Sequence, residues 1–530
     1  MKDLNGFIYQ LILYFLLLVA SIASAQNVGI GTPTPNAKLH IKGSEDATQF
    51  VIDAGSTQGN TRPLIRLRKS NGTDLMWINS DDTSNVFIGR NVGRLNTATV
   101  SGGINNTFIG SNSAYSNTTG SLNSAIGAKS FYFNSTGDAN TVYGATSLRL
   151  NTTGQYNTAA GTGALYSNTF GIENTAVGST ALYSNTSGQD NTATGVNTLR
   201  SNSTGSYNTS IGYQLPRLDN STGSFNTEQG VDALLNITTG NYNTASGYQS
   251  LYQNTTGSYN VAIGHQSLFK NTTGIFNSAM GNDVLGNNSS GQQNLAIGNF
   301  SLNNLINASN NTVVGEGAGS GTIYYMGWNN TLMGESSIAN AAGIFNSIAI
   351  GKSSATTANN QVRIGNSFTA SIGGFAGWSN ISDGRVKKNV QENVPGLAFI
   401  AKLKPVTYNL SLEKADTIMT IPPEKKRDGK LIRESALEVY AHKLKEQIVY
   451  TGFIAQDVEK AAKELGFDFS GVDAAKHNAD LYALRYAEFV VPLVKAAQEL
   501  SERNVQLKKQ QEEMKKRLEK LERALNLKNK

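Results

Sequence analysis

A serine, an aspartate, an arginine and two lysines lie within seven residues of one another near the start of the last third of the chain. They are Ser382, Asp383, Arg385, Lys387 and Lys388. A serine hydroxyl becomes a nucleophile only beside a base, and a lysine is that base when burial or nearby positive charge lowers its pKa. Ser382 is therefore a candidate nucleophile, with a nearby lysine, Lys387 or Lys388, as its candidate base. The alternative is structural, with the Ser-Asp pair as an N-cap.

Metal and thiol chemistry is not expected. The chain has 530 residues, no Cys and only four His, so it has no disulfide framework, thiolate zinc site or cysteine nucleophile. A multi-histidine metal centre is improbable, and we expect no metal and no cofactor.

The charges are unevenly distributed. The net charge of +6 divides into +2 for residues 1–95, −2 for residues 96–381 and +6 for residues 382–530. Because the last segment is far more densely charged, a domain boundary is predicted near residue 382. Acids and bases are interleaved there, so we expect no nucleic-acid partner.

The N-terminal residues resemble a secretory signal. An apolar run from Leu11 to Ala20 is followed by Ala23-Ser24-Ala25, a small-residue cleavage site, and the run is short for a membrane span. We therefore expect a secreted or cell-surface protein with no transmembrane anchor after cleavage. Short alternating segments broken by Gly, Asn and Asp then predict a β-rich region.

The central part of the chain is repetitive, with a period of 17. One glycine recurs at positions 110, 127, 144, 161, 178, 195 and 212 and, after a one-residue slip, at 230, 247, 264, 281, 298 and 315. An asparagine lies four residues before each, a leucine lies four residues after many, and a second glycine closes an Asn-Thr-Thr-Gly-like turn. The register loosens at the end, where the glycine follows at positions 334, 351 and 365.

A period of 17 is too short for a helical repeat and fits one coil of a β-solenoid, with two short strands and two tight turns. Inward positions are expected to be the Ala, Val or Ile just before the glycine and the Leu after it. The asparagines are expected to form a hydrogen-bonded ladder, and the glycines to supply positive φ. These are structural roles, so no consensus residue is expected to be catalytic.

The last unit, Asn346 to Ala355, resembles the 14-residue repeats of trimeric autotransporter adhesin heads. That resemblance implies left-handed parallel β-rolls packed as a trimeric, surface-displayed stalk or head.

Four motifs after residue 381 occur in order. They are Ser382-Asp383-x-Arg385-x-Lys387-Lys388-Asn389, Leu403-Lys404-Pro405-Val406-Thr407-Tyr408, Thr451-Gly452-Phe453-Ile454-Ala455-Gln456-Asp457 and Ala483-Leu484-Arg485-Tyr486 leading to Leu500. This segment resembles the intramolecular chaperone domain of endosialidase-type tailspikes, the peptidase S74 family.

The resemblance implies an α+β domain that trimerises, templates the folding of the stalk before it, and cuts the chain at its own N-terminal edge. The catalytic dyad of that family falls on Ser382 and Lys387, with Asp383 and Arg385 in orienting or oxyanion-stabilising roles. The cut is implied between Ser382 and Asp383, whereas ring size in attack on the chain's own carbonyls favours the Ile381 carbonyl. The side of Ser382 stays open.

Residues 411–447 form a polar insertion to which we assign no function, and His442 and His477 are expected to be solvated. From Leu493 onward, apolar residues recur at seven-residue spacing with partners four residues later, which predicts a coiled coil with polar Asn504 and Gln511 at core positions. A parallel trimer fits the stalk; a single amphipathic helix is the alternative.

The sequence thus predicts a mainly β protein with six parts. They are a signal peptide (1–25), a β-rich region (26–95), a β-solenoid (96–366), a linker (367–381), an S74-type α+β domain (382–492) and a coiled coil (493–527).

The expected function is that of an exported homotrimeric fibre or adhesin-like protein with a single self-cleavage and no external substrate, its stalk touching a glycan or another cell-surface ligand. Two rivals remain. One is a polysaccharide-degrading tailspike, for which only Glu173 and Asp190 share a position in adjacent coils. The other is an ice-binding solenoid, suggested by Thr-rich turns.

Overall fold

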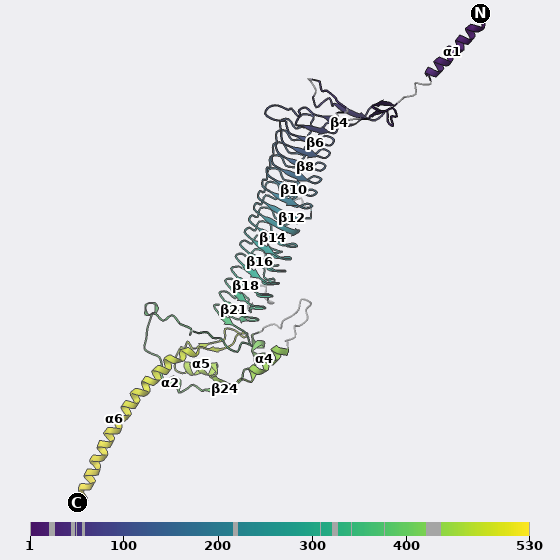
Figure 1. Cartoon of the computed structure of the whole chain (residues 1–530). Helices are drawn as coiled ribbons and strands as arrows, with labels where there is room; N and C mark the ends of the chain where they lie inside the picture. Colours follow the sequence, from purple (N-terminus) through teal and green to yellow (C-terminus); the bar gives the residue numbers. More distant parts are fainter. Residues whose placement is uncertain are drawn as a thin grey trace.

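The structure is a computed structural model of the chain. It describes residues 2–20, 27–43, 48, 50–55, 59–215, 221–307, 309–320, 327–340, 342–375, 377–419 and 436–528. A long rod of stacked coils separates an N-terminal helix from a C-terminal helical region (Figure 1).

The N-terminal region contains a helix followed by short strands. Its elements are α1 (Lys2–Ala20), β1 (Val28–Ile30), β2 (Leu39–Ile41), β3 (Ile65–Arg68) and β4 (Asp74–Asn79). β1 and β2 pair in parallel, while β3, β4 and the first strand of the rod pair antiparallel. Among the helices that the structure describes, none has the length and apolar character of a membrane span. The predicted cleavage site, Ala23 to Ala25, lies outside the described residues.

The rod is one parallel ladder of very short strands. They are β5 (Val86–Ile88), β6 (Thr107–Ile109), β7 (Ser124–Ile126), β8 (Thr141–Tyr143), β9 (Thr158–Ala160), β10 (Thr175–Val177), β11 (Thr192–Thr194), β12 (Thr209–Tyr213), β13 (Thr227–Val231), β14 (Thr244–Ser246), β15 (Val261–Ile263), β16 (Ser278–Met280), β17 (Leu295–Ile297), β18 (Thr312–Val314), β19 (Thr331–Met333), β21 (Ile348–Ile350) and β23 (Val362–Ile364). Each pairs with the next, so the chain forms a β-solenoid.

The register of this ladder confirms the repeat. Thr175 pairs with Thr192, its equivalent one repeat later, and the one-residue slip of the sequence falls between β12 and β13. The last strands, from β18 to β23, pair at the uneven offsets that the glycine spacing predicts. The ladder begins at β5, somewhat before residue 96. At roughly 4.8 Å a coil, about 16 coils make a rod on the order of 75 Å long.

The core of the rod is thin and regular. The second residue of each strand from β5 to β21 and the leucine four residues after the glycine point inward; Ala176 and Leu182 are fully buried. The residue directly before the glycine was also expected inside, and this is wrong: Val177 is 41% exposed, because side chains alternate across a strand. The inward leucine is confirmed.

The expected second strand of each coil is absent along most of the described rod; only β20 (Ile338–Ala339) and β22 (Ala355–Thr356) form it, near the end. The reason is backbone geometry. Nine inward leucines, from Leu148 to Leu302, have φ between +47° and +52°, which is left-handed and breaks an extended strand.

Two asparagine ladders run along the inside of the rod. In the predicted one, each Asn Nδ2 donates to the Asn Oδ1 of the coil before, as from Asn174 to Asn157 at 3.1 Å. A second ladder, which the sequence analysis did not identify, uses the asparagine of the Asn-Thr-Thr-Gly turn, as from Asn168 to Asn151 at 2.8 Å. Both sets are buried, so each amide needs these partners.

Glycine is needed at its two positions in the repeat for two different physical reasons. The glycines that end the strands have φ between +116° and +143° from Gly110 to Gly315, as expected. The turn glycines do not have positive φ. A Cβ on Gly171, for example, would lie 2.5 Å from the Gly188 carbonyl oxygen of the next coil. These turns need glycine because adjacent coils approach closely there.

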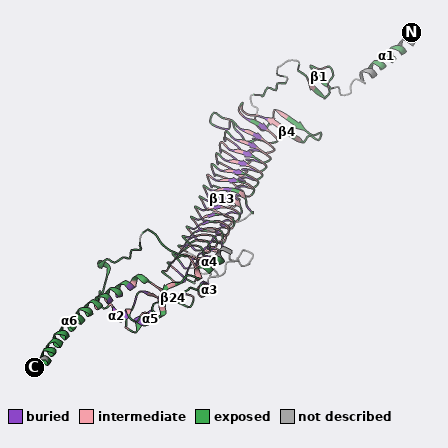
Figure 2. Ribbon diagram, turned by 60° about the horizontal axis from the view of Figure 1, so that its bottom comes forward, coloured by how far each residue is buried: buried purple, intermediate pink, exposed green. Residues whose placement is uncertain are grey.

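The C-terminal region is α+β and ends in a long helix. Its elements are η1 (Gly384–Val386), α2 (Leu397–Ile400), β24 (Val406–Tyr408), α3 (Leu412–Ile418), α4 (Ala436–Glu446), β25 (Tyr450–Gly452), α5 (Ala455–Lys463), β26 (Val472–Asp473), β27 (Ala483–Leu484), η2 (Tyr486–Phe489) and α6 (Val490–Lys528). A small aromatic core around Phe399, Phe469 and Phe489 joins α2, α5 and η2. Figure 2 shows burial along the rod and exposure along most of α6.

Candidate functional site

Ser382 lies on an exposed loop between the rod and the C-terminal core. The loop contains one short turn, η1, and Asp383 is its N-cap: the carboxylate accepts a hydrogen bond from the Arg385 backbone N–H at 2.9 Å. The structural alternative raised by the sequence therefore holds for Asp383. It does not involve the Ser382 hydroxyl.

The predicted nucleophile and base lie together. Lys387 Nζ donates to Ser382 Oγ at 2.9 Å. The turn of η1, which lies between the two residues, brings their side chains to the same place. Lys387, and not Lys388, is the lysine placed against the hydroxyl. This distance is that of a nucleophile beside its base. The catalytic role of the pair remains a prediction.

The Arg385 guanidinium is held by Asp383. Its Nη2 lies 2.5 Å and its Nε 2.9 Å from Asp383 Oδ2. The hydrogen bond from this side chain lowers the pKa of the Asp383 carboxyl, so the pair stays ionised. In this arrangement the two residues shape the loop that carries Ser382. The guanidinium would have to leave Asp383 to stabilise an oxyanion.

Nothing in the described chain covers this loop. Residues 377–393 are exposed throughout, and a Cβ added at Gly384 would meet no atom within 4 Å. A lysine serves as a base where burial or neighbouring positive charge favours its neutral form. The burial that the predicted chemistry needs is thus missing from a single chain.

The motifs after Ser382 converge on one core. Gly452 begins the Gly-Phe-Ile-Ala-Gln motif, and a Cβ there would lie 2.3 Å from the Tyr486 hydroxyl, which also accepts the Phe453 N–H at 3.2 Å. Likewise, Gly396 lies against the backbone of α6, and Glu499 accepts the Leu397 N–H at 2.8 Å. Motifs that are far apart in the sequence therefore fit together in space.

The expectation of solvated histidines is wrong for His442, which is partly buried, whereas His477 is exposed as expected but also contacts the rod. The ring of His442 stacks on Phe368 with centroids 4.1 Å apart, and His477 Nε2 lies 2.5 Å from the Thr357 carbonyl oxygen. Both contacts join the C-terminal region to the end of the rod. Long-range packing of this kind leaves no periodic signal in the sequence. The middle of the insertion, residues 420–435, lies outside the described residues.

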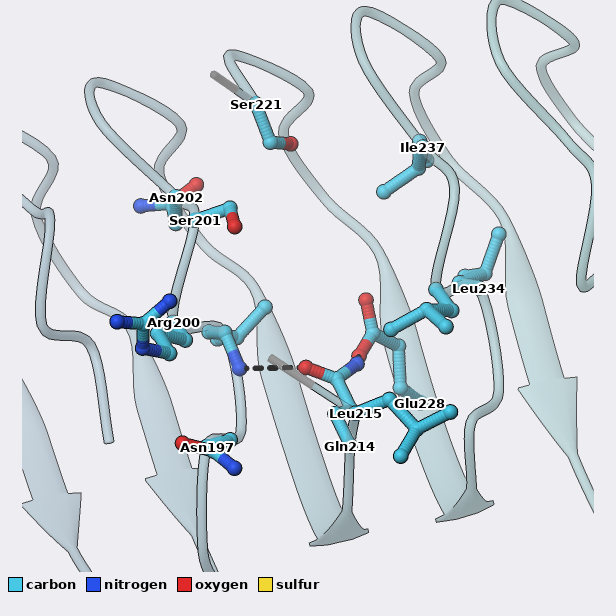
Figure 3. A pocket seen from close by; sticks show the side chains of 12 residues that line it. Asn197, Arg200, Ser201, Asn202, Gln214, Leu215, Ser221, Glu228, Leu234 and Ile237 are labelled. Carbon is cyan, nitrogen blue, oxygen red and sulfur yellow. Dashed lines mark hydrogen bonds between the residues drawn. The ribbon is translucent and has the colours of Figure 1, made fainter. Parts of the chain in front are cut away.

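A polar group interrupts the rod core where the repeat slips. Glu228 occupies an inward strand position that holds alanine in most other coils; Gln214 Nε2 donates to it at 2.6 Å, and Gln214 Oε1 accepts the Leu199 N–H at 2.9 Å (Figure 3). Burial raises the pKa of the Glu228 carboxyl to about 8, opposed by hydrogen bonds from Ser210 and Gln214. Sequence reasoning missed this site, although a glutamate in the alanine column marks it.

Among the described residues that line this pocket, Glu228 is the one acid. Within the described residues, no cluster of three His, Asp or Glu side chains could hold a metal ion.

The acids considered for a polysaccharide-degrading site interact directly with each other. A hydrogen bond shared with Asp190, followed by the negative charge of Asp190, raises the pKa of the Glu173 carboxyl. Glycosidase carboxyls are separated by roughly 5–9.5 Å to admit sugar and water. This pair does not favour that rival.

The arrangement of the threonines gives little support to the ice-binding alternative. A threonine column does run along the sheet from Thr141 to Thr244, but the neighbouring outward column mixes Tyr143, Val177 and Gln229. The sheet is therefore not a flat, regular threonine array.

One comparison with known proteins gives a family match that begins at Ser382. No curated protein gives a significant match to the chain. Residues 382–467, which begin at the predicted nucleophile and end before the last of the four motifs, match the Peptidase S74 family, described as the chaperone of endosialidase.

Proposed function

We propose that the protein is an exported, tail-fibre-like homotrimer whose C-terminal region chaperones the folding of its β-solenoid stalk and then frees itself by one self-cleavage beside Ser382. The observation that carries this proposal is the order of parts: a segment matching the chaperone of endosialidase follows a β-solenoid directly.

The long helix α6 supports self-association. Every residue from Leu500 to Leu525 is exposed, so no other part of the described chain packs against this half of the helix (Figure 2). The exposed side chains include the predicted core positions Leu507, Met514 and Leu521. An isolated helix is marginal in water, and an apolar seven-residue stripe is buried by neighbouring copies of the helix. A parallel coiled coil of three copies is the arrangement that we propose.

The stalk also presents a surface for its own copies. The outward column beside the strand-ending glycines is apolar along much of the rod, with Ile211, Met280 and Met333 each more than 40% exposed. An apolar stripe of this length is unusual on a monomer. We propose that this column faces the trimer axis, in β-rolls of the left-handed type that the adhesin-head resemblance implies.

The cleavage follows from the Ser382 loop once assembly buries it. Ser382 Oγ attacks a neighbouring carbonyl carbon while Lys387 Nζ, in its neutral form, takes the hydroxyl proton. The lysine then returns that proton to the departing amide nitrogen, and water hydrolyses the resulting ester. Attack on the Ile381 carbonyl cuts before Ser382, and attack from another chain of the trimer reaches the bond after it.

Two parts of the proposal concern the surroundings of the protein. Export rests on the apolar N-terminal sequence, and purified protein should then begin at Gln26. The proposal of a glycan ligand is based only on the fibre-like form of the protein. The exposed rings from Tyr207 to Phe276 do not provide a sugar platform, because neighbouring rings stack at 4.7–4.9 Å and cover each other's faces.

The experiment that tests the cleavage is a denaturing gel of the purified protein. Wild type should give two fragments, and Ser382→Ala should give one full-length band. Ser379→Ala, which removes an exposed hydroxyl three residues earlier, serves as the matched control and should cleave like wild type. Wild type that stays uncut after assembly would contradict the self-cleavage.

A further inference from the structure

The end of the rod is held by three segments of the C-terminal region. These segments are α3, α4 and the loop of residues 473–480, and they contact the last coils of the rod between residues 340 and 369. We call this set of contacts the docking face. Two of the three segments belong to the insertion of residues 411–447, to which the sequence assigned no function.

One half of the docking face is centred on a buried carboxylate. The Asp480 side chain is only 5% exposed; it accepts the Thr357 hydroxyl at 2.6 Å and the Lys476 backbone N–H at 3.1 Å. Arg363 of the last strand, β23, lies 3.9 Å from the same carboxylate, and His477 Nε2 faces the Thr357 carbonyl. A rod residue thus has both its hydroxyl and its carbonyl bound by the C-terminal region.

The other half grips the chain just after the last strand. Lys445 Nζ donates to the carbonyl oxygens of Ser367 and Thr369 at 2.5 and 2.7 Å. The Ser367 hydroxyl donates to Asp416 Oδ2 at 3.1 Å, and Phe368 stacks on the His442 ring. Three consecutive residues that follow the last strand are therefore bound by side chains from α3 and α4.

The docking face covers an end that a solenoid must protect. The terminal coil of a stacked repeat exposes unpaired strand edges and an open core, so natural solenoids cap it. Here Thr356 and Thr357 are buried although they lie in the last complete coil. The C-terminal region takes the place of such a cap.

The covalent link between the two parts is separate from this face. Residues 370–375 and 377–381 are exposed, and a Cβ added at Gly373, Gly374 or Gly377 would meet no atom within 4 Å. A cut in this linker or at Ser382 removes none of the docking contacts.

We infer that cutting the chain and releasing the C-terminal region are two separate steps, and that the docking face keeps residues 382–530 on the end of the stalk as a cap after the chain is cut. Cleavage alone then leaves a nicked but associated molecule. Release requires the contacts of Asp480 and Lys445 to open. This inference deepens the proposed function but does not depend on the self-cleavage, since any cut in the linker creates the same nicked state.

The test uses full-length Ser382→Ala protein, which does not cut itself. Limited chymotrypsin digestion at the exposed Phe375 or Trp378 supplies the cut. After digestion, a denaturing gel should show the stalk and C-terminal fragments, while gel filtration of the same sample should keep them in one peak. If the fragments separate as soon as the linker is cut, the inference is overturned.

Variants of the docking face sharpen the test. Asp480→Ala with Lys445→Ala should shorten the half-life of the nicked complex at least about tenfold, because each change leaves buried hydrogen-bonding groups unpaired. Thr357→Val, on the rod side, should act in the same direction without altering the C-terminal fold. Asp468→Ala removes an exposed carboxylate from the same region and should behave like the parent. Unchanged retention in both docking variants would also refute the inference.

Discussion

The Ser382 loop brings a hydroxyl and an ammonium together without burying either. Lys387 Nζ lies 2.9 Å from Ser382 Oγ, yet the loop is exposed. The contact between hydroxyl and ammonium thus forms within one chain, and in our proposal the desolvation that a lysine base needs comes from assembly. A protease built this way would cut only after its chains have assembled.

The lysine can be tested separately from the serine. Lys387→Met should lower the rate of self-cleavage by roughly 100-fold or more, because the hydroxyl loses its base. Lys388→Met removes the same charge one residue later and should leave most of the rate intact. The readout is the fraction of cut chain against time on a denaturing gel. Equal losses in both variants would assign the base to neither lysine in particular.

A turn glycine offers a second test on the scale of one residue. Gly171→Ala would place a Cβ 2.5 Å from the Gly188 carbonyl and 2.3 Å from Asn168 Oδ1, so adjacent coils must move apart. We expect the free energy of unfolding to fall by about 1–3 kcal/mol, as for other overpacked sites. Gly373→Ala, in open space, should be neutral. Thermal unfolding would compare them, and equal melting temperatures would disprove the close-approach argument.

Single residues were predictable where spacing is local. Ser382 and Lys387, five residues apart, were paired by the resemblance of their motif to the S74 family, and the structure places them in contact. Asp480, His442 and His477 were not identified, because their partners Thr357 and Phe368 belong to the distant end of the rod. Such contacts depend on how two regions meet, and composition does not encode that.

On the scale of elements, the polar group between β12 and β13 divides the rod. One apolar core runs from Phe87 to Leu199 and a second from Ala233 to Ala349, with Glu228 and Gln214 between them. Arg200 and Asp232 also lie near this junction, where Asp232 accepts the Leu215 N–H at 2.8 Å. The rod is thus two apolar stacks joined by a hydrogen-bonded polar group.

This junction should make stability depend on pH. The folded pKa of Glu228 is about 8, above the value near 4.5 of an exposed glutamate, so the folded state retains a proton that the unfolded state loses. Stability should therefore fall as pH rises from about 4.5 to 8, by an amount on the order of a few kcal/mol. Glu228→Gln should remove that slope, while the exposed Glu335→Gln should keep it. Thermal unfolding at pH 5 and pH 8.5 measures the difference; equal slopes in wild type and Glu228→Gln would contradict the assignment.

The elements themselves were partly predictable. The period of the glycines determined the parallel register, including its slips, because stacked equivalent residues must recur at the same spacing. The second strand of each coil was predicted wrongly, because the inward leucines adopt left-handed backbone angles. This conformation is rare for leucine, so the sequence does not indicate it. The second asparagine ladder could have been found, as its residues recur with the same period.

The whole molecule depends on surfaces that one chain leaves uncovered. α6 extends beyond the C-terminal core (Figure 1), and the outward apolar column runs along the rod. Both stripes lie on surfaces that another copy of the chain would cover. Assembly, burial of the Ser382 loop and cleavage are therefore linked steps in this account.

Disrupting α6 should stop all of these steps. Leu507→Glu with Met514→Glu places charges in the apolar stripe, so we expect loss of the oligomer and loss of self-cleavage together. Lys509→Glu with Lys516→Glu adds the same residues on the outward face of the helix and should preserve both. Sedimentation velocity and a denaturing gel report the two effects. Efficient cleavage in a monomeric Leu507→Glu, Met514→Glu protein would separate cleavage from assembly.

The central claim is that residues 382–530 are needed for three chains to form the stalk. Its most direct test is the mass in solution, by sedimentation equilibrium, of a chain ending at residue 381 beside full-length Ser382→Ala protein. The account predicts three chains per particle for the full-length protein and aggregated, misassembled material for the truncated chain. A soluble, folded trimer of the truncated chain would contradict it.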